Sequence, residues 1–357
     1  IAQLVRQARE INKFHSTFID SIQRYVHKGR IHSEINQLRS DQGGTVSGRL
    51  SYSNPNLQQI PARNKEFGDK IRSLFLPEEG RQWGSFDYSQ QEPRLVVHYA
   101  LKNGFYGAEE MAKEYREDPT TDFHEIVARM AKITRKQAKT INLGLFYGMG
   151  KNKLARSLEL EDDEAKELFE KYHSQVPFVR KLSQGLQDFA EKNKNIYTLE
   201  DRFCRFDKWE PINKEWNPEK GIFEISDYQE IDGKKQIVKI PVPILKRDEA
   251  ENRYHAEKAK NRHESDPHGQ YFEKHYRPAF TYKALNRLIQ GSAADMTKKA
   301  MVDLYEQGII PHIQIHDELC FSIKDDKQAD KIKSIMEDAI KLEVPNKVDY
   351  ESGPNWG

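Results

Sequence analysis

The spacing of apolar positions along the chain predicts helices and short strands in alternation. Residues 4–26 show helical spacing and contain little Gly or Pro, which predicts one or two helices. Helical patterns also occupy Glu109 to Lys194 and Thr281 to Gln307. The predicted breaks within the first of these two stretches are Gly144, Gly148 and Gly150.

One short apolar run ends on an acidic residue. Trp83 to Phe86 has the length and composition of a buried strand and is followed by Asp87. Ser89 and Glu92 then form an S-x-x-E capping signature ahead of a second apolar run, with Pro93 tolerable in the first helical turn. Asp87 is therefore expected at a strand-to-helix junction.

A second acidic residue lies in a predicted hairpin. The segment HIQIHDELCFSI, residues 312–323, alternates apolar and polar positions on both sides of its HDE triplet. This pattern predicts a strand, a tight turn carrying Asp317, and another strand.

Two regions depart from these regular patterns. Residues 41–63 are rich in Gly, Ser, Asn and Pro, which favours ordered loops and short strands. Residues 206–278 are rich in charged residues, Trp, Tyr and Pro, and we interpret them as an insertion. Within it we expect a hairpin that turns at Asp232 and Gly233, followed by a polar helix.

Composition narrows the class of protein. The 357 residues are 37% hydrophobic and 32% charged, and no apolar stretch approaches the roughly 20 residues of a membrane-spanning helix. Cys204 and Cys320 are too few for a disulfide framework, which favours a reducing compartment. The first residue is Ile1, so a fragment or a processed product is expected.

Charge is uneven along the chain although the net charge is only +1. Residues 1–72 contain 12 basic and 6 acidic residues. The segment from Arg129 to Lys153 contains seven basic residues and no acidic one, whereas a solvated helix face usually carries both signs. Both segments favour a polyanionic partner.

The two strand-end acids suggest one chemistry if folding brings them together. Two-metal phosphoryl transfer uses carboxylates to hold two divalent ions about 3.5 to 4 Å apart. The alternative is that Asp87 and Asp317 are unrelated turn residues. A helical stripe of Arg135, Lys139, Leu143 and Tyr147 could grip a triphosphate and flank a base, or be an ordinary surface helix with a partly buried side.

Five segments in fixed order give the chain a family resemblance. DYSQQEPR from Asp87, RKQAKTINLGLFYG from Arg135 and IHDE ending at Glu318 resemble motifs A, B and C of family A DNA polymerases, the DNA polymerase I type. Thr45 to Asn64 and Asn286 to Asp295 resemble two further segments of that family. The sequence QQEPR is similar to that of phage-like members.

The resemblance implies an α+β fold with the right-hand architecture of polymerases. It implies an antiparallel-sheet palm, helical fingers and a truncated helical thumb. The expected division is a thumb remnant at 1–40, a first part of the palm at 41–101, fingers at 102–285 with the insertion at about 206–278, and a second part of the palm at 286–357. No proofreading domain is expected in this chain.

The resemblance also implies roles for matching residues. The expected activity is template-directed addition of dNTPs to a primer 3′-OH, with pyrophosphate released. Two Mg²⁺ ions, replaceable by Mn²⁺, would be held by Asp87, Asp317 and the carbonyl of Tyr88. The expected catalytic residues are Asp87, Asp317, Lys139 and Glu318. Those expected to bind dNTP are Arg135, Lys139, Tyr147, His124, Glu92 and Leu143.

Glu92 would exclude a ribose 2′-OH, while Leu143 stands where the family usually has Phe or Tyr. The residues expected to contact DNA are Arg49, Gln290, Asn286, His316, Arg63 and Lys283. Donors such as Arg49 and Gln290 suit minor-groove acceptors, which all four bases present at similar positions. His316 could instead only close the hairpin turn.

The implied partners are primer-template DNA and dNTPs, with a helicase, primase or processivity factor as further candidates. A monomer without membrane association, in the cytoplasm of a bacterial host, is expected, with an organelle as the alternative. Two rival functions stay open: a related RNA polymerase or primase-like enzyme, and a nucleic-acid-binding module without activity. Glu92 argues against the first, and Asp87, Asp317 and Lys139 argue against the second.

Overall fold

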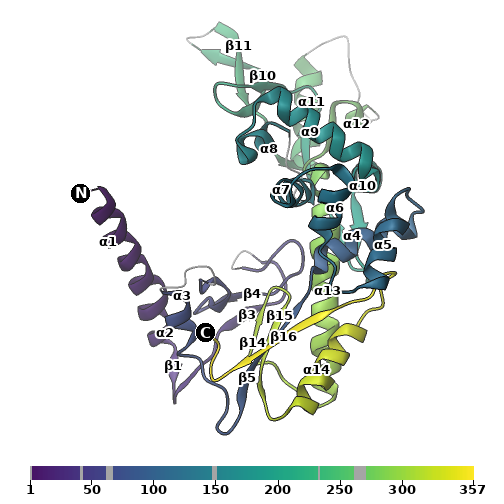
Figure 1. Cartoon of the computed structure of the whole chain (residues 1–357). Coiled ribbons are helices and arrows are strands. Elements are labelled where there is room, and N and C mark those ends of the chain that lie inside the picture. Colours follow the sequence, from purple (N-terminus) through teal and green to yellow (C-terminus); the bar gives the residue numbers. More distant parts are fainter. Residues whose placement is uncertain (1, 41–42, 62–66, 147–150, 232–233, 261–270) are drawn as a thin grey trace. The chain divides into compact units, whose positions relative to one another are not determined.

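The computed structural model describes residues 2–40, 43–61, 67–146, 151–231, 234–260 and 271–357 (Figure 1). Contacts between Cα atoms divide the chain into two compact units. The first comprises Ile1–Leu182, Thr198–Asp201 and Asn286–Gly357, and the second comprises Ser183–Tyr197 and Arg202–Leu285. Each unit is described by itself below.

The first unit begins with the helical segment that the sequence predicted, followed by short strands. These elements are α1 (Ala2–Phe14), the π-helical turn η1 (His15–Ile19), α2 (Asp20–Arg24), β1 (Val26–His27), β2 (Arg30–Ile31), β3 (Glu34–Asn36), β4 (Ser51–Ser53), the 3₁₀ turn η2 (Leu57–Gln59) and α3 (Gly68–Arg72). Strands β3 and β4 pair antiparallel. The region rich in Gly and Pro is thus ordered by short strands and turns wherever it is described, as expected.

A four-stranded antiparallel sheet lies at the centre of the first unit. Its strands are β14 (Ile313–Ile315), β15 (Glu318–Ile323), β5 (Gln82–Tyr88) and β16 (Val348–Gly353), in that order across the sheet. Helix α14 (Asp326–Asp338) packs against β15 and β16 (Figure 1). Gly84 is required in β5 because a Cβ atom there would approach Cγ1 of Ile323 to 2.4 Å.

A buried cluster joins the N-terminal segment to this sheet. Trp83 of β5 stacks on Trp356 with ring centroids 6.0 Å apart, and Phe75 meets Trp356 edge-on at 5.4 Å. The buried members of the cluster are Phe18, Leu50, Tyr52, Leu57, Ile60, Ile71, Trp83, Ile313, Cys320 and Trp356. Aromatic side chains bury the largest apolar areas, so this cluster fixes the segment around Leu50 against the hairpin formed by β14 and β15.

Helices follow β5 in close succession. They are α4 (Gln91–Lys102), α5 (Ala108–Glu117), α6 (Phe123–Ala131), α7 (Arg135–Phe146), α8 (Lys151–Leu158), α9 (Asp162–Gln175), α10 (Pro177–Asn193) and α13 (Ala284–Glu306). Helix α7 contacts both α6 and α8, and α6 also contacts α9. No helix among the described residues is both long enough and apolar enough to span a membrane.

Two local predictions are wrong in this part of the chain. The predicted capping box does not form, because Ser89 is still extended and its N–H donates to the carbonyl of Lys347 at 2.8 Å. Helix α4 begins instead after Gln90, an N-cap residue with φ of 52° and no capping side chain. Gly144 does not end a helix but lies within α7, because packing against α6 outweighs the roughly 1 kcal/mol cost of an interior glycine.

The second unit contains the stretch that we interpreted as an insertion. Its elements are β6 (Asn195–Tyr197), β7 (Phe203–Arg205), β8 (Lys208–Pro211), β9 (Glu215–Asn217), β10 (Ile222–Ile231), β11 (Lys234–Pro241), β12 (Leu245–Lys246), α11 (Arg247–Lys260), α12 (Phe272–His275), β13 (Tyr276–Pro278) and the 3₁₀ turn η3 (Thr281–Lys283). The predicted hairpin corresponds to β10 and β11, and the predicted polar helix to α11. The expected turn residues Asp232 and Gly233 lie outside the described residues.

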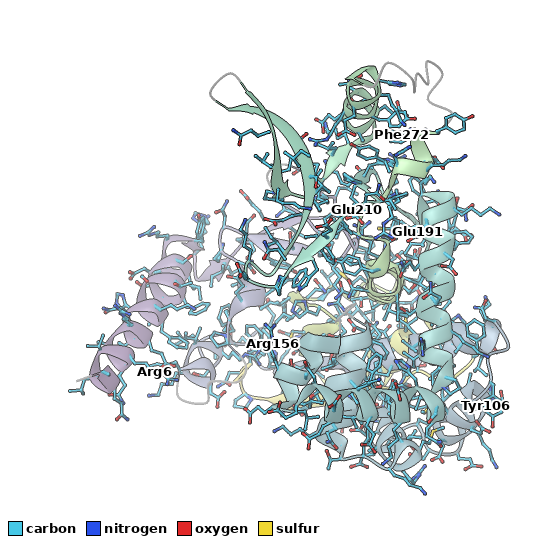
Figure 2. The ribbon with its side chains drawn as sticks, turned by 90° about the horizontal axis from the view of Figure 1, so that it is seen from above. Arg6, Tyr106, Arg156, Glu191, Glu210 and Phe272 are labelled. Atoms are coloured by element: carbon cyan, nitrogen blue, oxygen red, sulfur yellow. The ribbon has the colours of Figure 1, made fainter. Side chains whose placement is uncertain are left out.

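The second unit has a core of its own. Trp209, Ala250, Tyr254, Phe272 and Tyr276 are buried together, and the rings of Phe272 and Tyr276 stack with centroids 5.3 Å apart. The buried carboxylate of Glu210 accepts hydrogen bonds from Lys214 at 2.6 Å and Arg277 at 3.0 Å. Figure 2 labels Glu210 and Phe272. The insertion is therefore a folded element with its own apolar core and satisfied buried charge.

Candidate active site

The register of the central sheet places acidic residues side by side. Asp87 of β5 is directly opposite Glu318 of β15 on one side and Asp349 of β16 on the other. Residues directly opposite each other in antiparallel strands project from the same face of the sheet. One face of the sheet therefore carries three carboxylate residues in a row across its three neighbouring strands.

Asp317 lies next to this row, in the turn that joins β14 to β15. Ile315 pairs with Glu318, so His316 and Asp317 form a two-residue turn, and His316 has the positive φ of 57° that such a turn requires. The backbone N–H of Tyr88 donates to the carbonyl of Asp317 at 3.4 Å. The end of β5 and the turn are therefore adjacent, as the sequence interpretation of Asp87 and Asp317 required.

The acidic residues strongly disfavour one another's ionisation. Desolvation by the surrounding protein, followed by the negative charges of Asp317 and Glu318, raises the pKa of Asp87 to about 8. The Asp87 side chain retains an exposed edge, so repulsion between carboxylates is the firmer cause of this shift. Burial likewise raises the pKa of Asp317, against the positive charge of Arg49.

This arrangement fits a divalent cation, which would remove the repulsion between the carboxylates. Oxygen atoms of Asp87, Asp317 and the Tyr88 carbonyl are hard ligands of the kind that Mg²⁺ prefers. No group of three or more His, Cys, Asp or Glu side chains is spaced as a complete metal site within the described part of the chain. A cation here would therefore depend on water and substrate oxygens for its remaining ligands.

Arg49 neutralises one carboxylate close to the row. Its Nη2 atom lies 2.8 Å from Oε1 of Glu92, and both side chains are largely buried, with 19% and 15% exposed. The Arg49 segment is fixed to the hairpin because Nε2 of Gln58 donates to the carbonyls of Leu50 and Gln314, each at 3.3 Å. The structure thus brings Arg49, Glu92, His316 and Asp317 into one neighbourhood.

The predicted phosphate-binding residues cluster on α6 and α7. Asp122 caps α6 by accepting hydrogen bonds from the N–H groups of His124 at 2.7 Å and Glu125 at 3.2 Å. Nη2 of Arg135, at the start of α7, donates to the other carboxylate oxygen of Asp122. Partial burial alone would raise the pKa of Asp122, but these hydrogen bonds outweigh it and hold the pKa below its ordinary value.

The other predicted residues fall into three groups. Lys139 and Leu143 are exposed on α7, and Asn286 and Gln290 are half-buried on α13. Lys283 belongs to the second unit, where its ammonium group lies 4.9 Å from the ring centroid of Phe280. Tyr147 and Arg63 lie outside the described residues.

Two residues of the first motif connect the acidic row to α6, and sequence reasoning missed both. The Gln90 side chain accepts from the N–H of Phe123 at 2.7 Å and donates to the carbonyl of Thr121 at 2.9 Å. The buried Arg94 guanidinium donates to the carbonyls of Ser89, Pro119 and Pro345, at 2.8, 2.5 and 2.6 Å. An arginine and a glutamine beside a strand end were the available signals, but their partners are 25 or more residues away in sequence.

Known proteins share this sequence and fold. The model of DNA polymerase family A matches residues 1–220 and 245–357, which leaves out only part of the β10–β11 hairpin and the residues around it. A DNA-directed DNA polymerase of Pseudomonas phage M6 is 34% identical over 405 residues, covering 100% of this chain and 51% of the relative. A thermostable DNA polymerase I of Thermus filiformis is 30% identical over 374 residues, covering 100% of this chain and 36% of the relative.

A solved structure shows the same arrangement of elements. The polymerase domain of Pol1 from M. smegmatis, in complex with DNA primer-template and dNTP, matches 98% of this chain and 52% of that chain, with a TM-score of 0.68 and 26% identity. The present chain thus spans about half the length of the phage relative and of this structure. The family match over most of the chain, the ordered motifs and the fold together establish that this chain belongs to DNA polymerase family A.

Proposed function

We propose that this chain carries the active centre of a template-directed DNA polymerase. The primer 3′-OH would attack the α-phosphate of a dNTP, forming a phosphodiester bond while the bond to pyrophosphate breaks. The observation that carries this proposal is the register that sets Asp87 beside the turn containing Asp317, in the same compact unit as the basic residues of α7. The relative of known structure contains DNA primer-template and dNTP, which supports these substrates.

Asp87, Asp317 and the Tyr88 carbonyl would hold two Mg²⁺ ions, for which Mn²⁺ could substitute. When bound, the two ions neutralise the attacking and leaving oxygens. The carboxylates are held by a backbone ladder, so they need little rearrangement when substrate arrives. Glu318, directly opposite Asp87, and His316 in the turn would steady the primer end.

Helix α7 would bind the triphosphate. Arg135 and Lys139 are one helical turn apart and both exposed, so they can contact neighbouring phosphate groups, with His124 of α6 as a third donor. Lys139 would stabilise the charge that develops on the departing pyrophosphate. Leu143, and Tyr147 outside the described residues, would flank the new base pair.

Glu92 and Arg49 would act at the sugar and at the minor groove. Their ion pair shows that each is held ready for a partner of opposite charge or for a hydrogen-bond donor. Glu92 would exclude a 2′-OH, which selects deoxynucleotides. The proposed DNA contacts are Arg49, Gln290, Asn286, His316, Arg63 and Lys283.

Primer extension with Asp317→Ala tests the metal assignment. We expect incorporation to fall by at least about 10³-fold while affinity for primer-template is retained, because the mutation removes transition-state stabilisation and not the duplex contacts. EDTA should abolish the activity of the unmodified chain. Turnover that survives both treatments would contradict the proposal.

A further inference from the structure

A chain of three polar side chains runs through the packed helices of the first unit and ends at His124. The hydroxyl of Tyr172 on α9 donates to Oδ1 of Asn142 on α7 at 2.5 Å. Nδ2 of Asn142 lies 2.9 Å from Nδ1 of His124 on α6. These contacts join three helices through one amide group.

Burial makes this chain of hydrogen bonds consequential. Asn142 and Tyr172 are 0% exposed, and His124 is 9% exposed. A buried polar group without a partner carries a large desolvation cost, so such groups occur almost only where their hydrogen bonds are made. A helix core that needed only to pack would be served better by an apolar residue at Asn142.

The direction of the hydrogen bonds follows from the hydroxyl of Tyr172. If the Asn142 amide were turned around, its NH₂ group would face that hydroxyl, and the hydroxyl hydrogen would have no acceptor among the described residues. In the orientation present, Tyr172 donates to Oδ1, and Nδ2 donates to Nδ1 of His124. The neutral imidazole must then carry its proton on Nε2.

The electrostatic surroundings of His124 agree with a neutral ring. Burial lowers the pKa of His124, and the positive charges of Lys139 and Arg135 lower it further, against the negative charge of Asp122. With Nδ1 engaged by Asn142, the Nε2–H group is the remaining donor of the ring. The ring therefore offers one hydrogen bond of fixed direction, and no net charge, beside two cationic side chains.

We propose that Asn142 and Tyr172 are positioning residues that orient His124 and fix its proton on Nε2, so that the ring donates a hydrogen bond to a phosphate oxygen of the incoming dNTP. This inference rests on the proposed function. Asn142 lies on the same helix as Arg135 and Lys139. One helix thus supplies two phosphate ligands directly and sets the orientation of the third through Asn142.

Tyr172→Phe is the first test, because it removes one hydroxyl and keeps the ring. In single-nucleotide incorporation we expect KM for dNTP to rise about 5- to 20-fold, the range for one lost hydrogen bond in a buried chain, with little change in primer-template affinity. Asn142→Leu should produce a change at least as large. Tyr99→Phe is the matched control, since it removes a hydroxyl that lies 2.7 Å from Oγ of Ser292, and KM for dNTP should stay unchanged.

A double-mutant cycle with His124→Ala separates positioning from a general structural role. If Asn142 and Tyr172 act through His124, then Tyr172→Phe and Asn142→Leu should add less than about twofold to KM for dNTP once the ring is absent. Full additivity in the cycle would overturn the inference. Equal effects of Tyr172→Phe and Tyr99→Phe would also overturn it.

Thermal unfolding of each variant shows whether the fold is retained. Should Asn142→Leu fail to fold, the cycle of Tyr172→Phe with His124→Ala decides the question alone. The Asp317→Ala experiment distinguishes failure of the two proposals. If Asp317→Ala abolishes incorporation while His124→Ala leaves KM for dNTP unchanged, the proposed function stands and the positioning inference falls.

Discussion

The acidic row on the sheet and the basic cluster on the helices treat charge in opposite ways. Across β15, β5 and β16 the carboxylates of Glu318, Asp87 and Asp349 lie side by side, and the pKa of Asp87 is raised by loss of hydration and by like charge. On α6 and α7 the guanidinium of Arg135 already has Asp122 as a partner. The sheet therefore needs an external cation, whereas the helices must exchange an internal anion for an external one.

The difference follows from what holds each group in place. A backbone ladder fixes the carboxylate positions, so repulsion between them cannot be relieved by moving the strands. The side chain of Arg135 is long and half-exposed, so it can change partners at small cost. Rigid like charges favour tight cation binding, and flexible paired charges favour reversible binding of a substrate.

The largest expected effect comes from breaking the acidic row. Asp87→Asn should reduce incorporation by at least about 10³-fold because a proposed metal ligand becomes a neutral amide. Mg²⁺ should raise the unfolding temperature of the unmodified chain, since a ligand that binds only the folded state stabilises it, and this rise should disappear in the variant. Scanning fluorimetry with and without Mg²⁺ measures the second effect.

Glu351→Gln is the control for that variant. Glu351 is exposed on β16 and pairs with Ser85, not with Asp87, so its removal takes one negative charge from the same sheet but no proposed ligand. Activity and the Mg²⁺-dependent stabilisation should both persist. An Asp87→Asn variant that behaved like Glu351→Gln would show that the acidic row is not the metal site.

Loss of a cation from α7 should have the next largest effect. Lys139→Ala should lower kcat/KM about 100-fold, within the range for removal of one group that stabilises transition-state charge. Lys136→Ala removes an equally exposed cation from the same helix but lies outside the stripe of Arg135 and Lys139. Equal losses for the two variants in steady-state incorporation would mean that α7 acts only through its net charge.

Glu92 offers a sharper view of the one acidic residue near the sheet that is already neutralised. Glu92→Ala should increase incorporation of rNTP relative to dNTP about tenfold, because the side chain proposed to exclude the 2′-OH is removed. The variant also frees Arg49 from its ion pair. Competition between rNTP and dNTP in the same reaction measures the change, and an unaltered ratio would remove Glu92 from sugar selection.

The smallest effect is expected from releasing Arg135. Asp122→Asn keeps an oxygen that can cap α6 but removes the negative charge that pairs with Arg135. KM for dNTP should fall about two- to fourfold, because a partly exposed ion pair contributes about 1 kcal/mol or less. A rise in KM would show instead that Asp122 orients Arg135 toward the substrate.

Sequence patterns located the proposed active site but not its supporting contacts. Asp87 and Asp317 could be found because each follows an apolar run that ends abruptly, and Arg135 and Lys139 because they repeat at helical spacing. Gln90, Arg94, Asn142 and Tyr172 gave no comparable signal. Their function depends on carbonyl groups and side chains that are remote in sequence, which no local pattern encodes.

The predicted capping box failed for a related reason. Ser89 and Glu92 have the correct spacing, but Ser89 is engaged by the carbonyl of Lys347 and Glu92 by Arg49, from opposite ends of the chain. Gly144 was taken as a helix break because interior glycine is unfavourable in an isolated helix. Packing within the first unit supplies the missing stability, and α7 continues through it.

By itself, the sequence determined the kinds of elements, the order of the motifs and the membership in a polymerase family, because periodicity and motif spacing are local properties of the chain. Only the tertiary structure decided that Asp87 faces Glu318 and Asp349 in one register and that Asn142 bridges Tyr172 to His124. Those pairings depend on long-range packing, in which the burial of apolar clusters fixes where distant polar groups meet. The same packing deprives these polar groups of water, and this loss of hydration gives their mutual contacts their strength.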